Sequence, residues 1–324
     1  ITTYFILNKK SILLIKKIKQ FVADKTSKYP NINLYARSFY HQTKIIKRKS
    51  IKCYRPQYSQ IEEEKIIGPN KNQILVKTFF SALNSGTELA VLNREKKTKV
   101  EFPYVPSGSG VGKILKVGKN INHFNKGDIV VGPFKHATKQ VMDTRFLAKI
   151  DARSKIEEYS LFHLAVIALQ GIRMANIKKK DVKTAVIGQG IIGRLTTLIL
   201  RSMGINVICI TLNKSKLEYF NEHSGIAIKS QNNKTNIESL NADVIFDVSG
   251  DPEAIHTAIL GVKKFGKVIL LGSSRGNTKE FDLNGNAKVK KVTISGAHIN
   301  NIDSKWNLYG QNYKLEVKFL ENLI

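Results

Sequence analysis

Thr184–Gly193 reads T-A-V-I-G-Q-G-I-I-G and decides the fold of the second half of the chain. Its first four residues predict a short buried strand, and Ile191–Ser202 has the apolar spacing of a helix. Between the two, Gly188, Gly190 and Gly193 form the spacing G-x-G-x-x-G. Glycines there permit a tight turn, close approach of the backbone to a pyrophosphate, and close packing of helix on strand. The stretch therefore predicts a dinucleotide-binding turn.

Further along the chain, strand-like and helix-like patterns alternate. The predicted elements are the strand Asn206–Ile210, the helix Lys214–His223, the strand Asp243–Asp247, the helix Pro252–Val262, and the strands Val268–Leu271 and Val292–Gly296. This alternation predicts an α/β domain with a doubly wound parallel sheet flanked by helices.

Before the turn, the pattern is different. Short β-type runs punctuated by glycines occur at Gln73–Thr78, Gly112–Val117 and Asp128–Val131, and Ser154–Asn176 has helical spacing. We therefore predict a basic extension at 1–49, a mostly β domain at 50–150, a dinucleotide-binding domain at 151–300 and a C-terminal segment at 301–324.

Composition agrees with two domains and raises the question of an anionic partner. The 324 residues are 42% hydrophobic, and 53 Lys+Arg against 25 Asp+Glu give a net charge of +28. That excess would suit nucleic acid, an anionic membrane surface or an acidic ligand. However, 43 of the basic residues are lysines and only 10 are arginines, which weighs against nucleic acid because phosphate and guanine recognition favours arginine. A drift toward A/T-rich codons explains the lysines equally well.

The first fifty residues are more basic than the rest, with 12 Lys+Arg against the single acid Asp24. Ile12–Val22 has the pattern of a basic amphipathic helix. It is interpreted as a membrane-surface anchor, an organelle transit segment, or a peripheral or disordered extension with its lysines in water, and we favour the last. The widely separated Cys53 and Cys209 indicate a reducing compartment, so we expect a cytoplasmic protein, with organelle targeting as the alternative.

The choice of dinucleotide depends on the end of the second strand. An acid that would bind the adenosine ribose is replaced by Thr211, and Lys214 and Lys216 follow. A hydroxyl with nearby cations accepts a 2′-phosphate, so we predict a preference for NADP(H) over NAD(H), although a permissive NAD site has the same appearance. The remaining cofactor-binding candidates lie in the turn or at the ends of later strands: Ile191, Ile192, Ser249, Gly250, Gly272 and Ser273.

Five fragments together resemble the medium-chain dehydrogenase/reductase superfamily, in which a GroES-like β domain precedes a Rossmann domain. They are Pro69–Val76, Ser81–Leu89, Gly110–Gly118, Phe124–Val131 and Val186–Gly193, in the family's order. The variant S-G-T-E is most similar to a zinc-free branch that includes bacteriochlorophyllide dehydrogenase-like proteins and oxidoreductases of surface-polysaccharide synthesis. The resemblance implies an NAD(P)-dependent oxidoreductase and, by analogy, a homodimer formed by edge pairing of Rossmann sheets.

The departures from the family concern zinc. Zinc-dependent relatives have Cys-Gly-Thr-Asp where this chain has Ser85–Glu88, and Gly-His-Glu where it has Ser107–Ser109; their third ligand position falls near Val166. Serine, glycine and valine are poor replacements for thiolate and imidazole, so we predict no catalytic zinc.

The resemblance also supplies the catalytic candidates. Thr87 matches a proton-relaying hydroxyl, and Glu88 matches the acid beside it; the same two residues would equally cap a short helix, Thr87–Arg94. His136 follows the strand Asp128–Val131 and suits proton exchange near neutral pH. Tyr104 is a weaker acid candidate.

The predicted function is a zinc-independent, NAD(P)(H)-dependent oxidoreductase acting on a small-molecule ketone/secondary alcohol couple in the cleft between the domains. The rivals are a quinone or enoyl-type C=C reductase, and a non-catalytic nucleotide-binding protein whose basic surface binds RNA or membrane. Residues 307–324 correspond only to the start of the family's return into the β domain, which predicts either a shortened tail or a truncated sequence.

Overall fold

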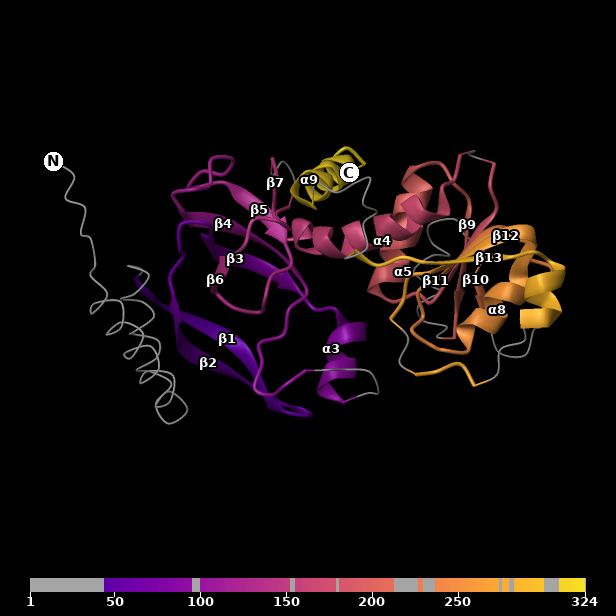
Figure 1. Ribbon diagram of the computed structural model, residues 1–324, viewed down its shortest axis with the longest axis horizontal. Helices are drawn as coiled ribbons and strands as arrows, with labels where there is room; N and C mark the ends of the chain where they lie inside the picture. The colour runs from indigo at the N-terminus through magenta and orange to yellow at the C-terminus, as the bar shows by residue number, and fades with distance from the viewer. Residues whose placement is uncertain are drawn as a thin grey trace, which may run out of the picture.

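The computed structural model describes residues 44–94, 100–151, 155–178, 181–212, 227–229, 237–273, 276–279, 283–299 and 309–323. Within these ranges the chain forms a β domain and an α/β domain that lie side by side along the long axis of the molecule (Figure 1). The predicted basic extension falls outside the described residues, apart from its last few positions.

The β domain contains a hairpin and a five-stranded antiparallel sheet. The hairpin pairs β1 (Ile45–Arg55) with β2 (Tyr58–Ile67). The sheet has the order β6-β3-β4-β5-β7, and its elements are β3 (Ile74–Ala82), β4 (Ser109–Val117), β5 (Ile129–Gly132), β6 (Lys139–Met142) and β7 (Ala148–Lys149). One helix, α3 (Ser85–Leu92), follows β3 and lies on the side that faces the other domain (Figure 1).

The second domain contains a six-stranded parallel sheet in the order β10-β9-β8-β11-β12-β13. Its elements are β8 (Thr184–Ile187), α5 (Ile191–Ser202), β9 (Val207–Thr211), β10 (Ala227–Lys229), β11 (Ala242–Asp247), α8 (Ala254–Gly261), β12 (Val262–Leu270), the π-helix η2 (Leu283–Ala287) and β13 (Thr293–Gly296). In sequence order this is 3-2-1-4-5-6, the arrangement of a Rossmann sheet. The predicted α/β architecture, a β domain followed by a doubly wound parallel sheet, is confirmed.

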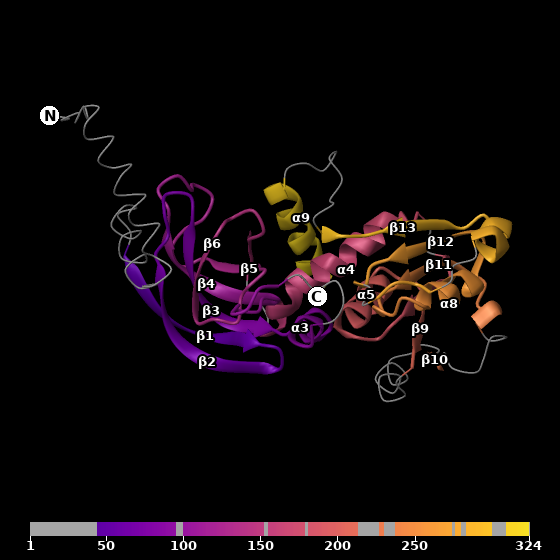
Figure 2. The same ribbon diagram turned by 60° about the horizontal axis from the view of Figure 1, so that its bottom comes forward.

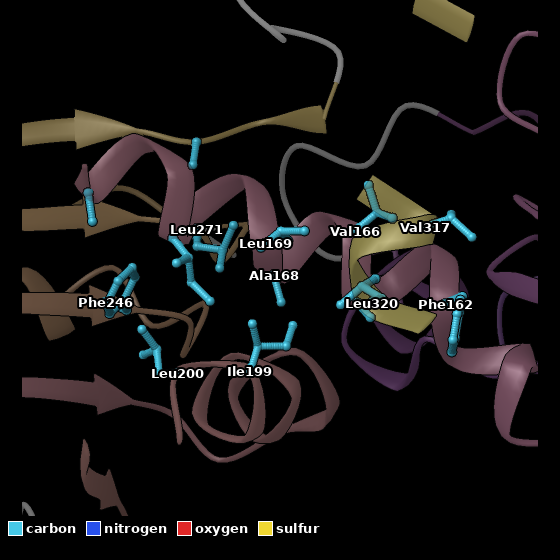
Figure 3. Packing of buried hydrophobic residues seen from close by; sticks show 14 of the residues in the cluster. Phe162, Val166, Ala168, Leu169, Ile199, Leu200, Phe246, Leu271, Val317 and Leu320 are labelled. Carbon is cyan, nitrogen blue, oxygen red and sulfur yellow. The ribbon is translucent and has the colours of Figure 1, made fainter. Parts of the chain in front are cut away.

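One helix joins the two domains and shares their core. A 3-10 turn, η1 (Glu158–Leu161), leads into α4 (Phe162–Ala175), of which ten residues are buried. Figure 3 shows α4 between α5, the parallel sheet and the C-terminal helix α9 (Tyr309–Glu321). The same cluster of buried side chains includes Val111 and Val131 of the β domain and Phe246 of β11. Burial of one such large apolar side chain contributes about 1.5–3 kcal/mol, so this shared core fixes the domains against each other.

The C-terminal helix α9 returns from the α/β domain toward the β domain (Figure 2). The ring of Tyr313 packs edge-on against Phe146 of the β domain, with centroids 6.3 Å apart, and its hydroxyl lies 3.1 Å from His163 Nδ1 on α4. Arg173 of α4 forms an ion pair of 3.1 Å with Glu316 of α9. The segment predicted to begin a return into the β domain therefore contacts both α4 and that domain.

Several boundaries differ from the sequence-based expectations. The β structure begins at Ile45 rather than Ser50, because β1 pairs with β2 as far back as the Ile45–Ile67 register. The strand β12 begins at Val262, six residues before the predicted strand, since Val262 already pairs with Ala242 of β11. The predicted helix Lys214–His223 lies outside the described residues. Among the described helices, none is both long and apolar enough to cross a bilayer.

Candidate functional site

A cleft of about 620 Å³ separates α3 from the carboxyl ends of the parallel strands. Its lining comes from both domains: Asn84, Ser85, Gly86 and Leu89 on the β side, and Ile187, Gly188, Gln189, Gly190, Ile191, Ile192, Ile210, Thr211, Leu212, Val248, Ser249, Asp251, Glu253, Ala254 and Thr257 on the other. Ligands of open α/β sheets bind at this edge, where the strand order reverses. The cleft is therefore the candidate site.

The glycine-rich turn, residues 188–193, forms the floor of the cleft. Gly188 has a φ of +94°, and a side chain at Gly193 would place its Cβ 1.8 Å from the Gly188 carbonyl oxygen. Both positions consequently exclude a Cβ for reasons internal to the protein. A Cβ at Gly190 would meet no atom within 4 Å, so the space beside it is open. Gly190 is the N-cap of α5, whose first-turn N–H groups favour an anion there.

Gln189 is a cleft residue that the sequence reasoning did not select. Its side chain is 1% exposed, and its Nε2 donates a 3.0 Å hydrogen bond to the Val186 carbonyl. Its Oε1 has no hydrogen-bond partner in the protein. A buried amide oxygen without a partner costs free energy, so the protein alone leaves this polar atom beside the cleft unsatisfied.

The adenosine end of the predicted cofactor site is identified by Thr211, the last residue of β9. Thr211 is buried and lines the cleft, whereas Lys214 and Lys216 lie outside the described residues. Two acids also line the cleft, and both are bound to neighbouring groups. Asp251 Oδ1 accepts the N–H of Glu253, and Glu253 Oε1 accepts the N–H of Lys279, both at 3.0 Å.

The predicted residues at the ends of β11 and β12 have different positions. Ser249 lines the cleft, and its N–H and hydroxyl both donate to Asp247 Oδ1, at 3.0 and 2.8 Å. Burial raises the pKa of the Asp247 carboxyl, and these two hydrogen bonds oppose that rise. Gly250, Gly272 and Ser273 are not among the residues that line the cleft. A Cβ at Gly272 would lie 2.9 Å from the Val248 carbonyl carbon, so this glycine permits close approach of two strand ends.

The opposite wall of the cleft is the first turn of α3, hereafter the α3 wall (Asn84, Ser85, Gly86 and Leu89). The helix begins at Ser85, two residues before the predicted start, with Asn84 as N-cap. Glu88 Oε1 accepts the N–H of Asn84 at 2.8 Å, so Glu88 caps the helix from within, as the alternative interpretation proposed for this acid. The Thr87 side chain is exposed and is not among the lining residues.

His136 lies behind the α3 wall rather than in the cleft. Its ring is buried; Nε2 is 3.1 and 3.2 Å from the two Glu88 carboxylate oxygens, and Nδ1 is 2.9 Å from Ser81 Oγ. On its other side His136 lines a second, shallower groove of about 250 Å³ together with Ser81 and Phe79. The structure thus brings His136 and Glu88 into direct contact but gives neither of them a place in the cleft lining.

Tyr104 belongs to the same buried region. Its backbone N–H and carbonyl pair with those of Cys53, at 3.0 and 2.8 Å, and its side chain is hydrogen-bonded to the Cys53 thiol. Burial, with the neighbouring Cys53 and Glu88, raises the pKa of the Tyr104 hydroxyl to about 12. The phenol therefore remains protonated at neutral pH.

The three positions that hold zinc in zinc-dependent relatives do not provide metal ligands. Ser85 lines the cleft and Val166 is fully buried in α4. At Gly108 a Cβ would lie 2.5 Å from the Ala82 carbonyl oxygen and 3.2 Å from Glu88 Oε1. The residues therefore do not fit a zinc ion. In the part of the chain that the structure describes, no group of three or more His, Cys, Asp or Glu side chains could hold a metal.

Sequence reasoning missed Ser81, Asn84, Gln189, Asp251 and Glu253. An N-cap preference could have indicated Asn84, since Asn commonly precedes a helix. The x position of G-x-G could have drawn attention to Gln189. Nothing local indicates Ser81, because its role depends on an imidazole that is 55 residues away in the chain.

Comparisons with known proteins agree with this geometry. Residues 192–312 match the family model described as zinc-binding dehydrogenase. L-threonine 3-dehydrogenase of Caldanaerobacter subterraneus subsp. tengcongensis is 23% identical over 285 residues, which are 76% of this chain and 81% of that protein.

Two solved structures share the fold. Galactitol-1-phosphate dehydrogenase from Escherichia coli has a TM-score of 0.74 at 16% identity, covering 85% of this chain and 89% of that one. A putative zinc-binding dehydrogenase from Sinorhizobium meliloti 1021, solved with bound NADP, has a TM-score of 0.72 at 16% identity, covering 84% and 89%.

The family match and these solved structures are of dehydrogenases, and this chain shares their architecture of a β domain followed by a Rossmann-type domain. The predicted class of activity, NAD(P)-dependent oxidoreduction, agrees with the names of these relatives.

Proposed function

We propose that this chain is a zinc-independent oxidoreductase of the medium-chain dehydrogenase/reductase type, which transfers hydride between a nicotinamide cofactor and a ketone/secondary alcohol couple. The observation that carries the proposal is the cleft, with the glycine-rich turn on one side and Asn84, Ser85 and Gly86 at the start of α3 on the other. A bound nicotinamide supplies the hydride donor or acceptor. The chain's own residues bind, orient and exclude water.

The zinc-independent part of the proposal is supported by the packing around Gly108. A histidine there would need the space that the Ala82 carbonyl and the Glu88 carboxylate occupy. The zinc-binding dehydrogenase match covers residues 192–312, which include none of the positions 85, 108 and 166. The match therefore concerns the dinucleotide-binding half and is compatible with loss of the metal.

The proton that accompanies hydride transfer needs a polar group near the substrate oxygen. Thr87 lies on the first turn of α3, between the lining residues Gly86 and Leu89, and its side chain is exposed. We propose its hydroxyl as the proton donor, with the Ser85 hydroxyl beside it in the cleft. The N-terminal turn of α3 would in addition stabilise negative charge that develops on the oxygen.

For the cofactor we propose a preference for NADP(H). Thr211 stands where an acid would repel a 2′-phosphate, and Lys214 and Lys216 follow it in the sequence. Asp251 and Glu253 place negative charge in the same cleft, but each is already bound to a backbone N–H. The preference for NADP(H) therefore requires that Lys214 and Lys216 attract the 2′-phosphate more strongly than Asp251 and Glu253 repel it.

The function is tested with protein purified in the presence of a chelator. NADPH and NADH dissociation constants are measured by cofactor fluorescence, metal content by mass spectrometry, and turnover on a panel of ketones, secondary alcohols and conjugated enones. We expect tighter binding of NADPH, less than one zinc per chain, and reduction of ketones without added metal. Turnover confined to enones would replace the proposal by a C=C reductase; binding of neither cofactor would refute it. If binding without turnover persists across the panel, the chain is a nucleotide-binding protein rather than an enzyme.

A further inference from the structure

Three side chains from separate segments form a chain of contacts behind the α3 wall. Ser81 is the last residue but one of β3, Glu88 lies on α3, and His136 lies between β5 and β6. Ser81 Oγ is 2.9 Å from His136 Nδ1, and His136 Nε2 is 3.1 and 3.2 Å from the two oxygens of Glu88. The side chains of His136 and Glu88 are 4% and 14% exposed, so water competes little for these contacts.

The backbone of His136 is held on both sides. Its N–H donates to the Pro106 carbonyl at 3.0 Å, and its carbonyl accepts the N–H of Ile51 at 2.9 Å. The imidazole therefore cannot follow α3 if the helix moves. It is a fixed point against which the Glu88 carboxylate is anchored.

The contacts also define the hydrogen-bonding roles. Nε2 faces a carboxylate, which only accepts, so Nε2 carries a proton and donates it to Glu88. Nδ1 then accepts from Ser81 Oγ in the neutral ring, or donates to it in the charged ring. Glu88 has a donor on each side, His136 Nε2 and the Asn84 N–H. Charge-assisted bonds of this kind are about twice as strong as neutral ones.

Glu88 connects His136 to the cleft through Asn84. Its partner Asn84 is the N-cap of α3, and Asn84, Ser85, Gly86 and Leu89 line the cleft whereas Glu88 and His136 do not. Gly108 packs on the same carboxylate, because a Cβ there would lie 3.2 Å from Glu88 Oε1. The carboxylate is thus enclosed by the helix N-cap, the imidazole and a residue that must be glycine.

We propose that Glu88 and His136 form a positioning pair, held by Ser81, which fixes the first turn of α3 against the bound nicotinamide without touching substrate. The proposal rests on the proposed function, since it requires a nicotinamide cofactor in the cleft. It assigns to His136 a role different from direct proton delivery. Contacts between side chains thus order the α3 wall, a role that a bound metal would have if the site held one.

The test uses the emission of bound NADPH, which reports how well the nicotinamide is shielded from water. In His136→Leu we expect the wild-type blue shift and intensity gain to be lost, while the dissociation constant for NADPH changes little. His136→Gln should restore much of the signal, because an amide N–H can still donate to Glu88. On a ketone that the wild type reduces, His136→Leu should lower kcat by about 10²-fold, as expected for a misplaced reacting group.

A matched control exists in the same domain. Glu64 accepts from Ser50 Oγ at 2.7 Å and pairs with Arg48 at 2.7 Å, so it is a second partly buried acid with a serine and a cation as partners, on the β1–β2 hairpin and not on α3. Glu64→Gln should leave the NADPH emission unchanged. If it reduces the emission as His136→Leu does, or if His136→Leu behaves as the wild type, the positioning role is refuted.

A second variant covers the case in which His136→Leu does not fold. Glu88→Gln keeps an acceptor for the Asn84 N–H but removes the charge, and we expect a partial loss of the emission shift. An unchanged shift in Glu88→Gln would contradict the proposal. If the wild-type protein itself binds neither NADPH nor NADH, it is the proposed function that fails, and this outcome is separate from a change confined to the variants.

Discussion

The two walls of the cleft are built in different ways. On the α/β side, the glycine-rich turn consists of six consecutive residues whose backbone closely approaches itself and the backbone of Val248 and Ser249. On the β side, the α3 wall is supported by side chains from β3, α3 and the segment before β6, which come together only in the folded domain. A backbone contact accepts no added atom, whereas a side-chain network accepts a substitution that keeps its hydrogen bonds. Substitutions at the crowded glycines of the first wall should therefore cause large losses of stability and cofactor binding. Substitutions in the second wall should cause losses that depend on how many hydrogen bonds are kept.

The largest effect is expected at Gly193. In Gly193→Ala the new Cβ would overlap the Gly188 carbonyl oxygen at 1.8 Å, so the turn must open and α5 must shift. We expect a loss of NADPH binding of at least about 10²-fold and a destabilisation of about 3 kcal/mol, within the range of severe core lesions. Fluorescence titration and urea unfolding measure the two quantities.

Gly190→Ala is the matched control for that change. Its Cβ would meet no protein atom within 4 Å, and its φ of −75° suits any residue, so the free energy of unfolding should stay within about 0.5 kcal/mol of wild type. Because the open space faces the cleft, cofactor affinity should still fall. If both variants lose the same free energy of unfolding, crowding of the new Cβ at Gly193 is not the cause of the loss.

The next effect concerns the contact between α4 and α9, which is made by His163 and Tyr313. Burial lowers the pKa of His163 to about 4, and its ring lies against the buried Tyr313 of α9. In the unfolded chain the histidine binds a proton below about pH 6.5, whereas the buried ring does so only near pH 4. Stability from this group is complete above pH 6.5 and decreases as the pH falls toward 4, by on the order of 2 kcal/mol at pH 5.

Urea unfolding at two pH values, near 7.5 and near 5, measures this dependence. His163→Gln should show a smaller loss of stability between the two than wild type, because it has no ring to titrate. Tyr313→Phe should retain the wild-type pH dependence while lowering stability at both. If wild type and His163→Gln lose the same free energy, the buried histidine is not the source.

A smaller effect is expected at Gly108 in the supported wall. Gly108→Ala would place a Cβ 2.5 Å from the Ala82 carbonyl oxygen and 3.2 Å from Glu88 Oε1, so both groups must move by part of an ångström. We expect a destabilisation of about 1–3 kcal/mol and a weaker shift of bound NADPH emission, with NADPH affinity largely kept. Gly276→Ala, whose Cβ would contact only the Pro252 ring at 3.5 Å, is the control.

The smallest effect is expected at Thr211. Thr211→Asp would restore a carboxylate at the end of β9, which repels a 2′-phosphate and accepts a ribose hydroxyl. NADPH affinity should fall by about tenfold, and NADH affinity should be retained or improved, since tenfold corresponds to only about 1.4 kcal/mol. Paired titrations with the two cofactors measure the change. A parallel loss for both would mean that Thr211 supports the strand end rather than selecting the cofactor.

The start of the α/β half could be predicted from the sequence residue by residue. The strand Thr184–Ile187 and the helix Ile191–Ser202 have the predicted bounds, because a buried strand, a glycine turn and an amphipathic helix are each encoded by neighbouring residues. The beginning of β12 was missed because Val262 is a strand residue only through its pairing with Ala242 of β11. The β1–β2 hairpin likewise starts earlier than its composition suggests, because its register extends back to Ile45.

Of the candidate site, only the side formed by the glycine-rich turn could be predicted from the sequence; the contacts behind the α3 wall could not. Of the residues selected for catalysis, Glu88 and His136 do meet, and Tyr104 lies in the same buried region, but the resemblance that suggested them said nothing of that contact. The side chains that complete the wall, Ser81 and Asn84, belong to no motif. Their role follows from what they touch.

The sequence encodes the glycine-rich turn locally at Gly193, where a Cβ would meet the Gly188 carbonyl oxygen of the same turn, and at Gly188 through its positive φ. The crowding of Gly188 against Ser249 is a tertiary contact. The sequence also determined the order of the two domains, through the change from β-type runs to strand–helix alternation.

The position of His136 behind the α3 wall, in contact with Glu88 and outside the cleft lining, follows from the tertiary structure alone. Glu88 and His136 are 48 residues apart, and no local period links them. Their contact exists because the segment before β4, through Pro106, and the hairpin, through Ile51, hold the backbone of His136 at the place where Glu88 caps the helix.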